Sequence, residues 1–148
     1  MAFERTRDIL EKARGFHRDL AAYFERLERI AQQEKVRMVL EYLRRHEHAM
    51  DEELKSFEAR AERPVLDSWF KYAPDSVRET IARLEIRPDL TVEEVVDIAL
   101  KLDEQLLELY GHAARLAPDA DARELFANLH REGLRERARI LRAVQAPD

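Results

Sequence analysis

Residues 34–61 read EKVRMVLEYLRRHEHAMDEELKSFEARA, and their apolar side chains recur at alternating spacings of four and three residues. This spacing lines up one stripe of side chains along a single face of an α-helix, as in the helices of a bundle. The stripe consists of Val36, Leu40, Leu43, Glu47, Met50, Leu54 and Phe57. Glu47 is the exception among them, because it places a carboxyl group in the middle of the face that should be buried.

The same spacing predicts three further long helices, over about 4–32, 92–116 and 122–145. Only a short link separates the first helix from the helix at 34–61, so these two should be antiparallel neighbours. We therefore expect the chain, residues 1–148, to form one all-α domain built as a four-helix bundle.

Two helix starts carry capping signals. Thr91 and Glu94 have the spacing of a capping box, in which the hydroxyl and the carboxylate each bind a free backbone amide at the start of a helix. Asp121 and Glu124 offer the same arrangement for the last helix. Both pairs support the predicted helix boundaries.

The segment 62–90 is interrupted by prolines and is too long for a simple helix-to-helix loop. As a crossover it can run the length of the bundle, so that the third long helix starts at the same end as the second. Its aromatic residues Trp69, Phe70 and Tyr72 should cover one flank of the core or join a dimer interface. A homodimer is plausible for a bundle of this size.

Composition excludes several classes of function. The 148 residues include no Cys and only three Gly, which excludes thiolate metal sites, Cys nucleophiles and Gly-rich phosphate loops. A net charge of −5 does not favour nucleic acid as a partner, and no apolar run is long enough to cross a membrane. The sequence therefore predicts a cytoplasmic protein without a nucleic-acid or membrane partner.

Each predicted helix carries a polar residue near the middle of its apolar stripe. These residues are His17, Glu47, Asp103 and Glu136. Because the four helices must pack together, we expect the four side chains to meet in one layer of the core. An unpaired buried carboxylate costs several kcal/mol, so each acid in this layer needs a partner.

Three arrangements satisfy that need. A metal ion could supply positive charge to the carboxylates. The acids could instead pair with His17 or with arginines from the flanks, such as Arg44 or Arg135. In the third arrangement the bundle is rotated slightly and the polar groups lie at a wet edge. The stripes alone do not decide among the three.

The sequence around these residues resembles the ferritin-like di-iron carboxylate bundles, and most closely their rubrerythrin-like branch. The resemblance lies in FHRDLAAYF at 16–24, LRRHE at 43–47, Leu-Asp at 102–103 with Tyr110 two turns later, and LFANL at 125–129. It spans the whole chain and includes the long crossover. It implies a ferritin-like four-helix bundle.

In that family two helices each supply one Glu and two supply Glu-x-x-His to the metals. The six matching positions here hold His17, Glu47, Met50, Asp103, Gly133 and Glu136. Met is a poor ligand for iron or manganese and Gly has no side chain, so a standard oxygen-activating two-iron centre is not expected. The resemblance leaves room for one divalent ion (iron, manganese or zinc) bound by His17, Glu47, Asp103 and Glu136, with His130 as an additional ligand.

Two functions follow from this site. The first is a ferritin-like protein that binds one divalent metal and serves in metal handling or the oxidative-stress response. The alternative is a non-enzymatic scaffold or interaction module whose polar layer is a remnant without metal. No residue is assigned a catalytic role. Around the layer, His46 is a candidate for orienting Glu47, and Tyr23 and Tyr110 are candidate hydrogen-bond donors.

Overall fold

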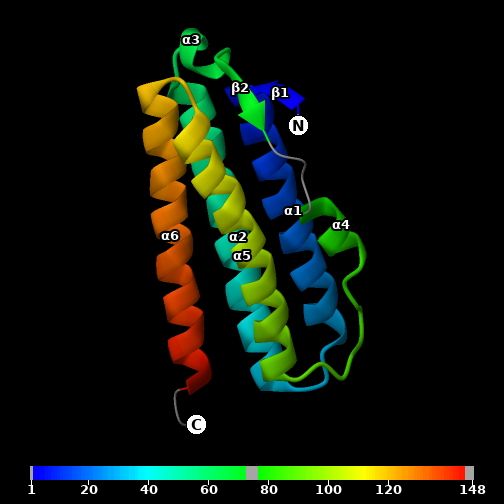
Figure 1. The fold of residues 1–148 in the computed structure, drawn as a ribbon. Coiled ribbons are helices and arrows are strands. Elements are labelled where there is room, and N and C mark those ends of the chain that lie inside the picture. Colours follow the sequence, from blue (N-terminus) through cyan, green and yellow to red (C-terminus); the bar gives the residue numbers. More distant parts are fainter. Residues whose placement is uncertain (1, 73–76, 146–148) are drawn as a thin grey trace.

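A computed structural model describes residues 2–72 and 77–145 of the chain. Within these residues four long helices form a bundle: α1 (Thr6–Ile30), α2 (Glu34–Arg60), α5 (Val92–Leu116) and α6 (Ala120–Gln145) (Figure 1). Each begins and ends within two residues of the range expected from the sequence. The predicted all-α four-helix bundle is confirmed.

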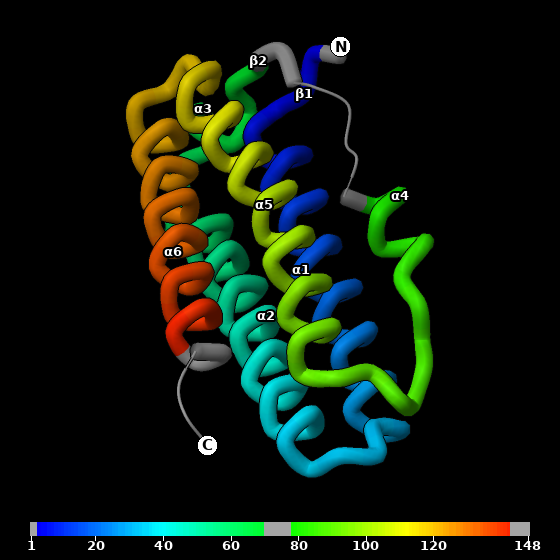
Figure 2. The backbone as a smooth tube through the Cα atoms, turned by 60° about the horizontal axis from the view of Figure 1, so that its bottom comes forward, coloured from blue at the N-terminus to red at the C-terminus, as the bar shows by residue number. Residues whose placement is uncertain are grey.

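The crossover gives the bundle its topology. It leaves the end of α2, runs along the outside of the bundle and returns to the other end, so that α2 and α5 start at the same end (Figures 1 and 2). The backbone amide of Gln32, in the turn between α1 and α2, donates to the carbonyl of Pro88 near the end of the crossover (3.3 Å). The long helices therefore lie as the crossover length predicted.

Among the described residues, four short elements lie in the crossover and near the N-terminus. The crossover contains α3 (Arg63–Leu66), β2 (Trp69–Tyr72) and α4 (Val77–Ala82). Strand β1 (Ala2–Arg5) pairs antiparallel with β2. The expectation of helix from residue 4 was wrong at this end, because the first residues pair with the aromatic WFKY segment, whose residue types favour strands.

One predicted helix cap is confirmed and one is wrong. At the start of α5 the amide of Glu94 donates to the Thr91 hydroxyl (3.1 Å), and the amide of Thr91 donates to the Glu94 carboxylate (3.1 Å). At the start of α6 the cap is Asp119, whose carboxylate accepts from the amide of Asp121 (2.8 Å). Asp121 is itself in the first turn, because α6 begins two residues earlier than expected.

Of the two places expected for the aromatic residues of β2, the exposure of Trp69 leaves the dimer interface as a prediction. Trp69 is 58% exposed, and Phe3 on the paired strand is 64% exposed, so neither is part of the core. The guanidinium of Arg5 lies over the Trp69 ring, 5.5 Å from its centroid. The side chains of Phe70 and Tyr72 lie outside the described residues.

The apolar stripes of the four long helices meet in one hydrophobic core. Its largest fully buried side chains include Phe16 on α1, Leu54 on α2, Leu102 on α5 and Phe126 on α6. In the described part of the chain, no helix has the length and apolar character needed to cross a membrane.

Candidate functional site in the bundle core

His17 and Glu47 form a buried pair between α1 and α2. Both lie on their helix's apolar stripe, which turns each side chain into the core, and each residue is 2% exposed. The distance from His17 Nδ1 to Glu47 Oε2 is 2.9 Å. Of the three arrangements left open by the sequence, this contact corresponds to the pairing of an acid with His17.

Tyr110 of α5 completes the group on the other side of the imidazole. Its hydroxyl oxygen lies 2.5 Å from His17 Nε2, and the two rings are nearly parallel, at 15°. An ionised carboxylate can only accept a hydrogen bond, so an ionised Glu47 assigns the proton to Nδ1. A neutral His17 then accepts a hydrogen bond from the Tyr110 hydroxyl at Nε2. Glu47, His17 and Tyr110 thus form a continuous series of hydrogen bonds that uses both ring nitrogens.

Glu136 of α6 belongs to a second group, which reaches the surface between α2 and α6. It is 2% exposed, and its Oε1 accepts a hydrogen bond of 2.5 Å from the hydroxyl of Tyr42. Its Oε2 accepts from Arg139 Nη1 at 3.2 Å and lies 3.5 Å from His46 Nδ1. Burial, followed by the bond to Glu136, raises the pKa of Tyr42 to about 12, so the phenol remains a donor at neutral pH.

Asp103 of α5 differs from the other acids, because its buried Oδ2 has no hydrogen-bond partner. Burial is the largest cause that raises its pKa, from 3.8 to about 8, and the charges of Glu47 and Glu136 raise it further. Arg137 opposes this shift. Glu47 and Glu136 therefore both lie within electrostatic range of Asp103, and the raised pKa favours the protonated form of Asp103 at neutral pH.

At Gly133, one of the six family ligand positions, a neighbouring side chain fills the space. A Cβ atom built on Gly133 would lie 2.7 Å from Cδ2 of Leu107, so the Leu107 side chain occupies the space where a ligand at residue 133 would begin. Met50 is 5% exposed and belongs to the apolar core. Together with the two occupied nitrogens of His17, these features show that the residues present do not fit a di-iron centre.

Two of the predicted supporting histidines lie elsewhere. The His130 ring packs against Gly111 of α5, where a Cβ would lie 3.4 Å from its Cδ2. His46, expected to orient Glu47, faces Glu136 instead, because it lies on the side of α2 that is turned towards α6. Among the described residues, no group of three or more His, Cys, Asp or Glu side chains is arranged to hold a metal ion.

Sequence reasoning identified Tyr110 as a candidate donor and missed Tyr42. Tyr110 marked the family resemblance and lies on the apolar stripe of α5. Tyr42 is 45% exposed and outside the stripe of α2, so nothing in the pattern signalled that its hydroxyl reaches a buried acid on another helix. Tyr23 is buried, but its hydroxyl donates to the carbonyl of Glu85 in the crossover (2.7 Å) and not to the layer.

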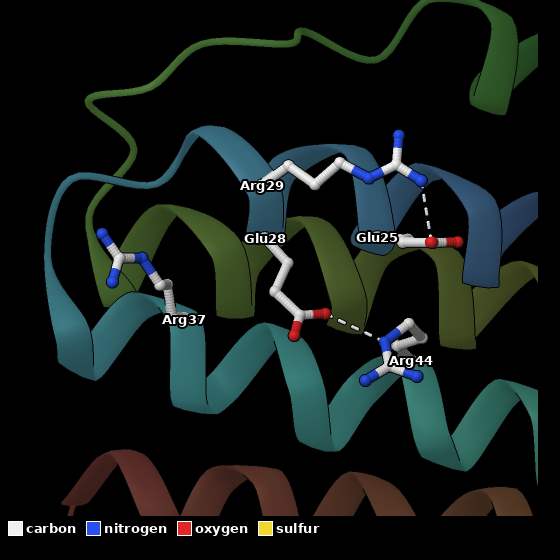
Figure 3. Close-up of a pocket in the computed structure, with 5 residues that line it drawn as sticks. All are labelled: Glu25, Glu28, Arg29, Arg37 and Arg44. Atoms are coloured by element: carbon white, nitrogen blue, oxygen red, sulfur yellow. Dashed lines mark hydrogen bonds and ion pairs between the residues drawn. The ribbon is translucent and has the colours of Figure 1, made fainter.

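A separate pocket of about 450 Å³ lies on the outside of α1 and α2 (Figure 3). It is lined by Glu25, Glu28, Arg29, Arg37 and Arg44. Arg29 and Arg44 each donate to one of the pocket's own carboxylates, at 2.8 Å and 2.9 Å (Figure 3). None of the layer residues lines it, so it is a surface feature distinct from the core site.

Comparison with solved structures supports the fold. No known family model and no curated protein matches the chain. A Thermotoga maritima protein, described as a ferritin-like diiron-carboxylate protein, superposes with a TM-score of 0.68 at 19% identity, over 96% of this chain and 95% of its own. The chain therefore has a ferritin-like fold, as the sequence resemblance implied.

Proposed function

We propose that the chain is a non-enzymatic ferritin-like bundle protein, of the rubrerythrin-like branch, whose central polar layer is held by hydrogen bonds instead of metal. The observation that carries this proposal is the Glu47–His17–Tyr110 chain, which engages both ring nitrogens of the only histidine in the layer. The position of Leu107 against Gly133 also supports it. On this proposal the bundle serves as a scaffold for binding, without oxygen chemistry.

Metal loading tests the proposal. Protein incubated with Fe(II), Mn(II) or Zn(II) and then desalted is expected to retain far less than one metal ion per chain. A Glu47→Ala variant should retain the same small amount, and Glu52→Ala, at an exposed position of the same helix, serves as the matched control. One ion per chain that is lost in Glu47→Ala and kept in Glu52→Ala would refute the proposal.

A second candidate function is a site for one divalent metal, used in metal handling or the oxidative-stress response. The observation that favours it is the unpartnered Oδ2 of Asp103, which lies within the field of Glu47 and Glu136. A cation there would relieve the repulsion among the three acids. Its ligands would come from His17, Glu47, Asp103 and Glu136, with His130 as the additional donor if its ring turned away from Gly111.

One double variant separates the two candidates. The variant Glu47→Gln/Asp103→Asn removes the buried charge of Glu47 and replaces the Asp103 carboxyl, whose pKa is raised by burial, with a group that does not titrate, which removes a cost of burial if no cation is present. The melting temperature should then rise relative to the parent. If the native layer holds a metal, the same change removes ligands and the melting temperature should fall, and added metal should no longer raise it.

The scaffold proposal includes self-association. The exposed side chains of Phe3 and Trp69 lie on paired strands at one end of the bundle, where a second copy would remove them from water. Sedimentation equilibrium is expected to show a dimer for the parent and a weaker dimer for Trp69→Ala. A parent that stays monomeric at high concentration would exclude this part of the proposal.

A further inference from the structure

The contact between Tyr110 and His17 places an oxidisable phenol directly against a proton acceptor. The hydroxyl lies 2.5 Å from His17 Nε2, and both residues are 2% exposed. On the far side of the ring, Nδ1 lies 2.9 Å from the Glu47 carboxylate. A phenol loses an electron more easily when its proton leaves in the same step, because the protonated phenoxyl radical is a very strong acid.

We propose that Tyr110 is a one-electron donor, with His17 as its proton acceptor and Glu47 as the group that stabilises the imidazolium. The electron goes to a strong one-electron oxidant, such as a peroxyl radical or a high-valent metal complex in solution. The O–H bond of Tyr110 breaks and its proton binds His17 Nε2. The products are a neutral phenoxyl radical, an imidazolium ion and the reduced oxidant.

The charges around the pair favour this reaction. Loss of one electron makes the group more positive by one unit, and the imidazolium that forms is in contact with Glu47. Glu136 adds to the negative field of the layer, since both acids act on Asp103 of the same helix. The low exposure of Tyr110 shields the radical from coupling with a second radical in solution.

The other described tyrosine side chains lack this combination. Tyr23 is also buried, at 5% exposure, but its hydroxyl donates to the backbone carbonyl of Glu85, and an amide oxygen is a very weak base. Tyr42 donates to the Glu136 carboxylate but is 45% exposed, so a radical there is open to solvent. Tyr23 is therefore the natural control for Tyr110.

The proposal can be tested on metal-free protein, with photogenerated tris(bipyridine)ruthenium(III) as the oxidant. Electron paramagnetic resonance should detect a long-lived tyrosyl radical in the parent and in Tyr23→Phe. The long-lived component should be absent from Tyr110→Phe. A signal of parental yield and lifetime in Tyr110→Phe would overturn the proposal.

The role of His17 has its own test. Glutamine preserves hydrogen bonding but is not a base, so the His17→Gln variant should form the radical about a hundredfold more slowly in transient absorption. An unchanged rate in a variant whose circular dichroism matches the parent would refute His17 as the acceptor.

A measurement on the parent covers the case in which these variants do not fold. Histidine labelled with a nitrogen isotope should show a hyperfine coupling to the radical, because the imidazolium is hydrogen-bonded to the phenoxyl oxygen. A tyrosyl radical without that coupling would also overturn the proposal. All three tests use metal-free protein, so their outcome is separate from that of the metal-loading experiment and from the oligomeric state.

Discussion

The α1–α2 side of the central layer and its α5–α6 side deal with buried acids in different ways. On the first side the Glu47 carboxylate is hydrogen-bonded to His17, and His17 is hydrogen-bonded to Tyr110 through its other ring nitrogen. On the second side Asp103 has an unpartnered oxygen, and Glu136 is reached by groups from the bundle surface. The comparison teaches that one layer can combine pairing, protonation and contact with the surface.

The largest expected effect comes from removing the centre of the satisfied side. His17→Ala leaves the Glu47 carboxylate and the Tyr110 hydroxyl buried without a partner, and it also opens a cavity. We expect the free energy of unfolding to fall by about 3–5 kcal/mol in urea denaturation. Tyr23→Phe, which removes one buried hydrogen bond elsewhere, should cost about 1 kcal/mol. If the two variants lost the same free energy of unfolding, the hydrogen bonds of His17 would contribute no more to stability than an ordinary buried hydrogen bond.

Asp103→Asn should stabilise the protein, in contrast to His17→Ala, and the size of this effect should depend on pH. The pKa of Asp103 is raised in the folded state, from 3.8 to about 8, so the folded protein keeps a proton that the unfolded chain loses. The contribution of Asp103 to stability is therefore greatest below the unfolded value and is lost as the pH rises through about 8.

Asn does not titrate, so the free energy of unfolding of the variant should rise relative to that of the parent by a few kcal/mol as the pH increases from acidic values to about 8. Thermal unfolding across this pH range measures the gain, and Asp97→Asn, at an exposed position of the same helix, should track the parent. If Asp103→Asn is instead less stable than the parent at neutral pH, the carboxylate has a cationic partner in the native protein.

Tyr42→Phe tests the surface-reaching contacts of Glu136. The variant removes one donor to a charged acceptor, while Arg139 remains bound to the same carboxylate. We expect a loss of about 1.5–3 kcal/mol in the free energy of unfolding. Arg139→Ala should cost less, because the Arg139 side chain is 51% exposed and its charge is screened by water. The reverse order would mean that the ion pair dominates this side of the layer.

The smallest expected effect is the difference in stability between alanine substitutions at two helical glycines, Gly15 and Gly133. Gly15→Ala meets no atom within 4 Å and should stabilise the protein by about 0.5–1 kcal/mol through backbone entropy. Gly133→Ala would place its Cβ 2.7 Å from Leu107, so the cost of displacing the leucine side chain should offset part or all of this stabilisation. Chemical denaturation of both variants measures the difference, and equal gains would mean that Leu107 moves freely.

The spacing of apolar residues was enough to predict the long helices and the placement of polar groups at the centre. A residue on a stripe of period 3.6 faces the core whatever its neighbours are, and this holds for His17, Glu47 and Glu136. The length of the crossover also predicted that α2 and α5 start at the same end. These features depend on local sequence, which is why they could be read from it.

Contacts that depend on the rotation and spacing of neighbouring helices were not predictable in this way. His46 was expected beside Glu47 on its own helix, but it lies against Glu136 of α6. Tyr42 lies outside the stripe and still reaches the same acid. The β1–β2 ribbon joins segments separated by more than 60 residues, as in the pairing of Arg5 with Trp69, and four-residue strands leave little periodicity.

The most direct test is anomalous diffraction at the iron edge from crystals soaked with Fe(II). A layer held by hydrogen bonds predicts no anomalous peak among Glu47, Asp103 and Glu136, with His17 Nδ1 still at hydrogen-bond distance from the Glu47 carboxylate. An anomalous peak from a metal ion coordinated by these side chains, with His17 turned away from Glu47 towards the metal, would contradict a layer held by hydrogen bonds alone.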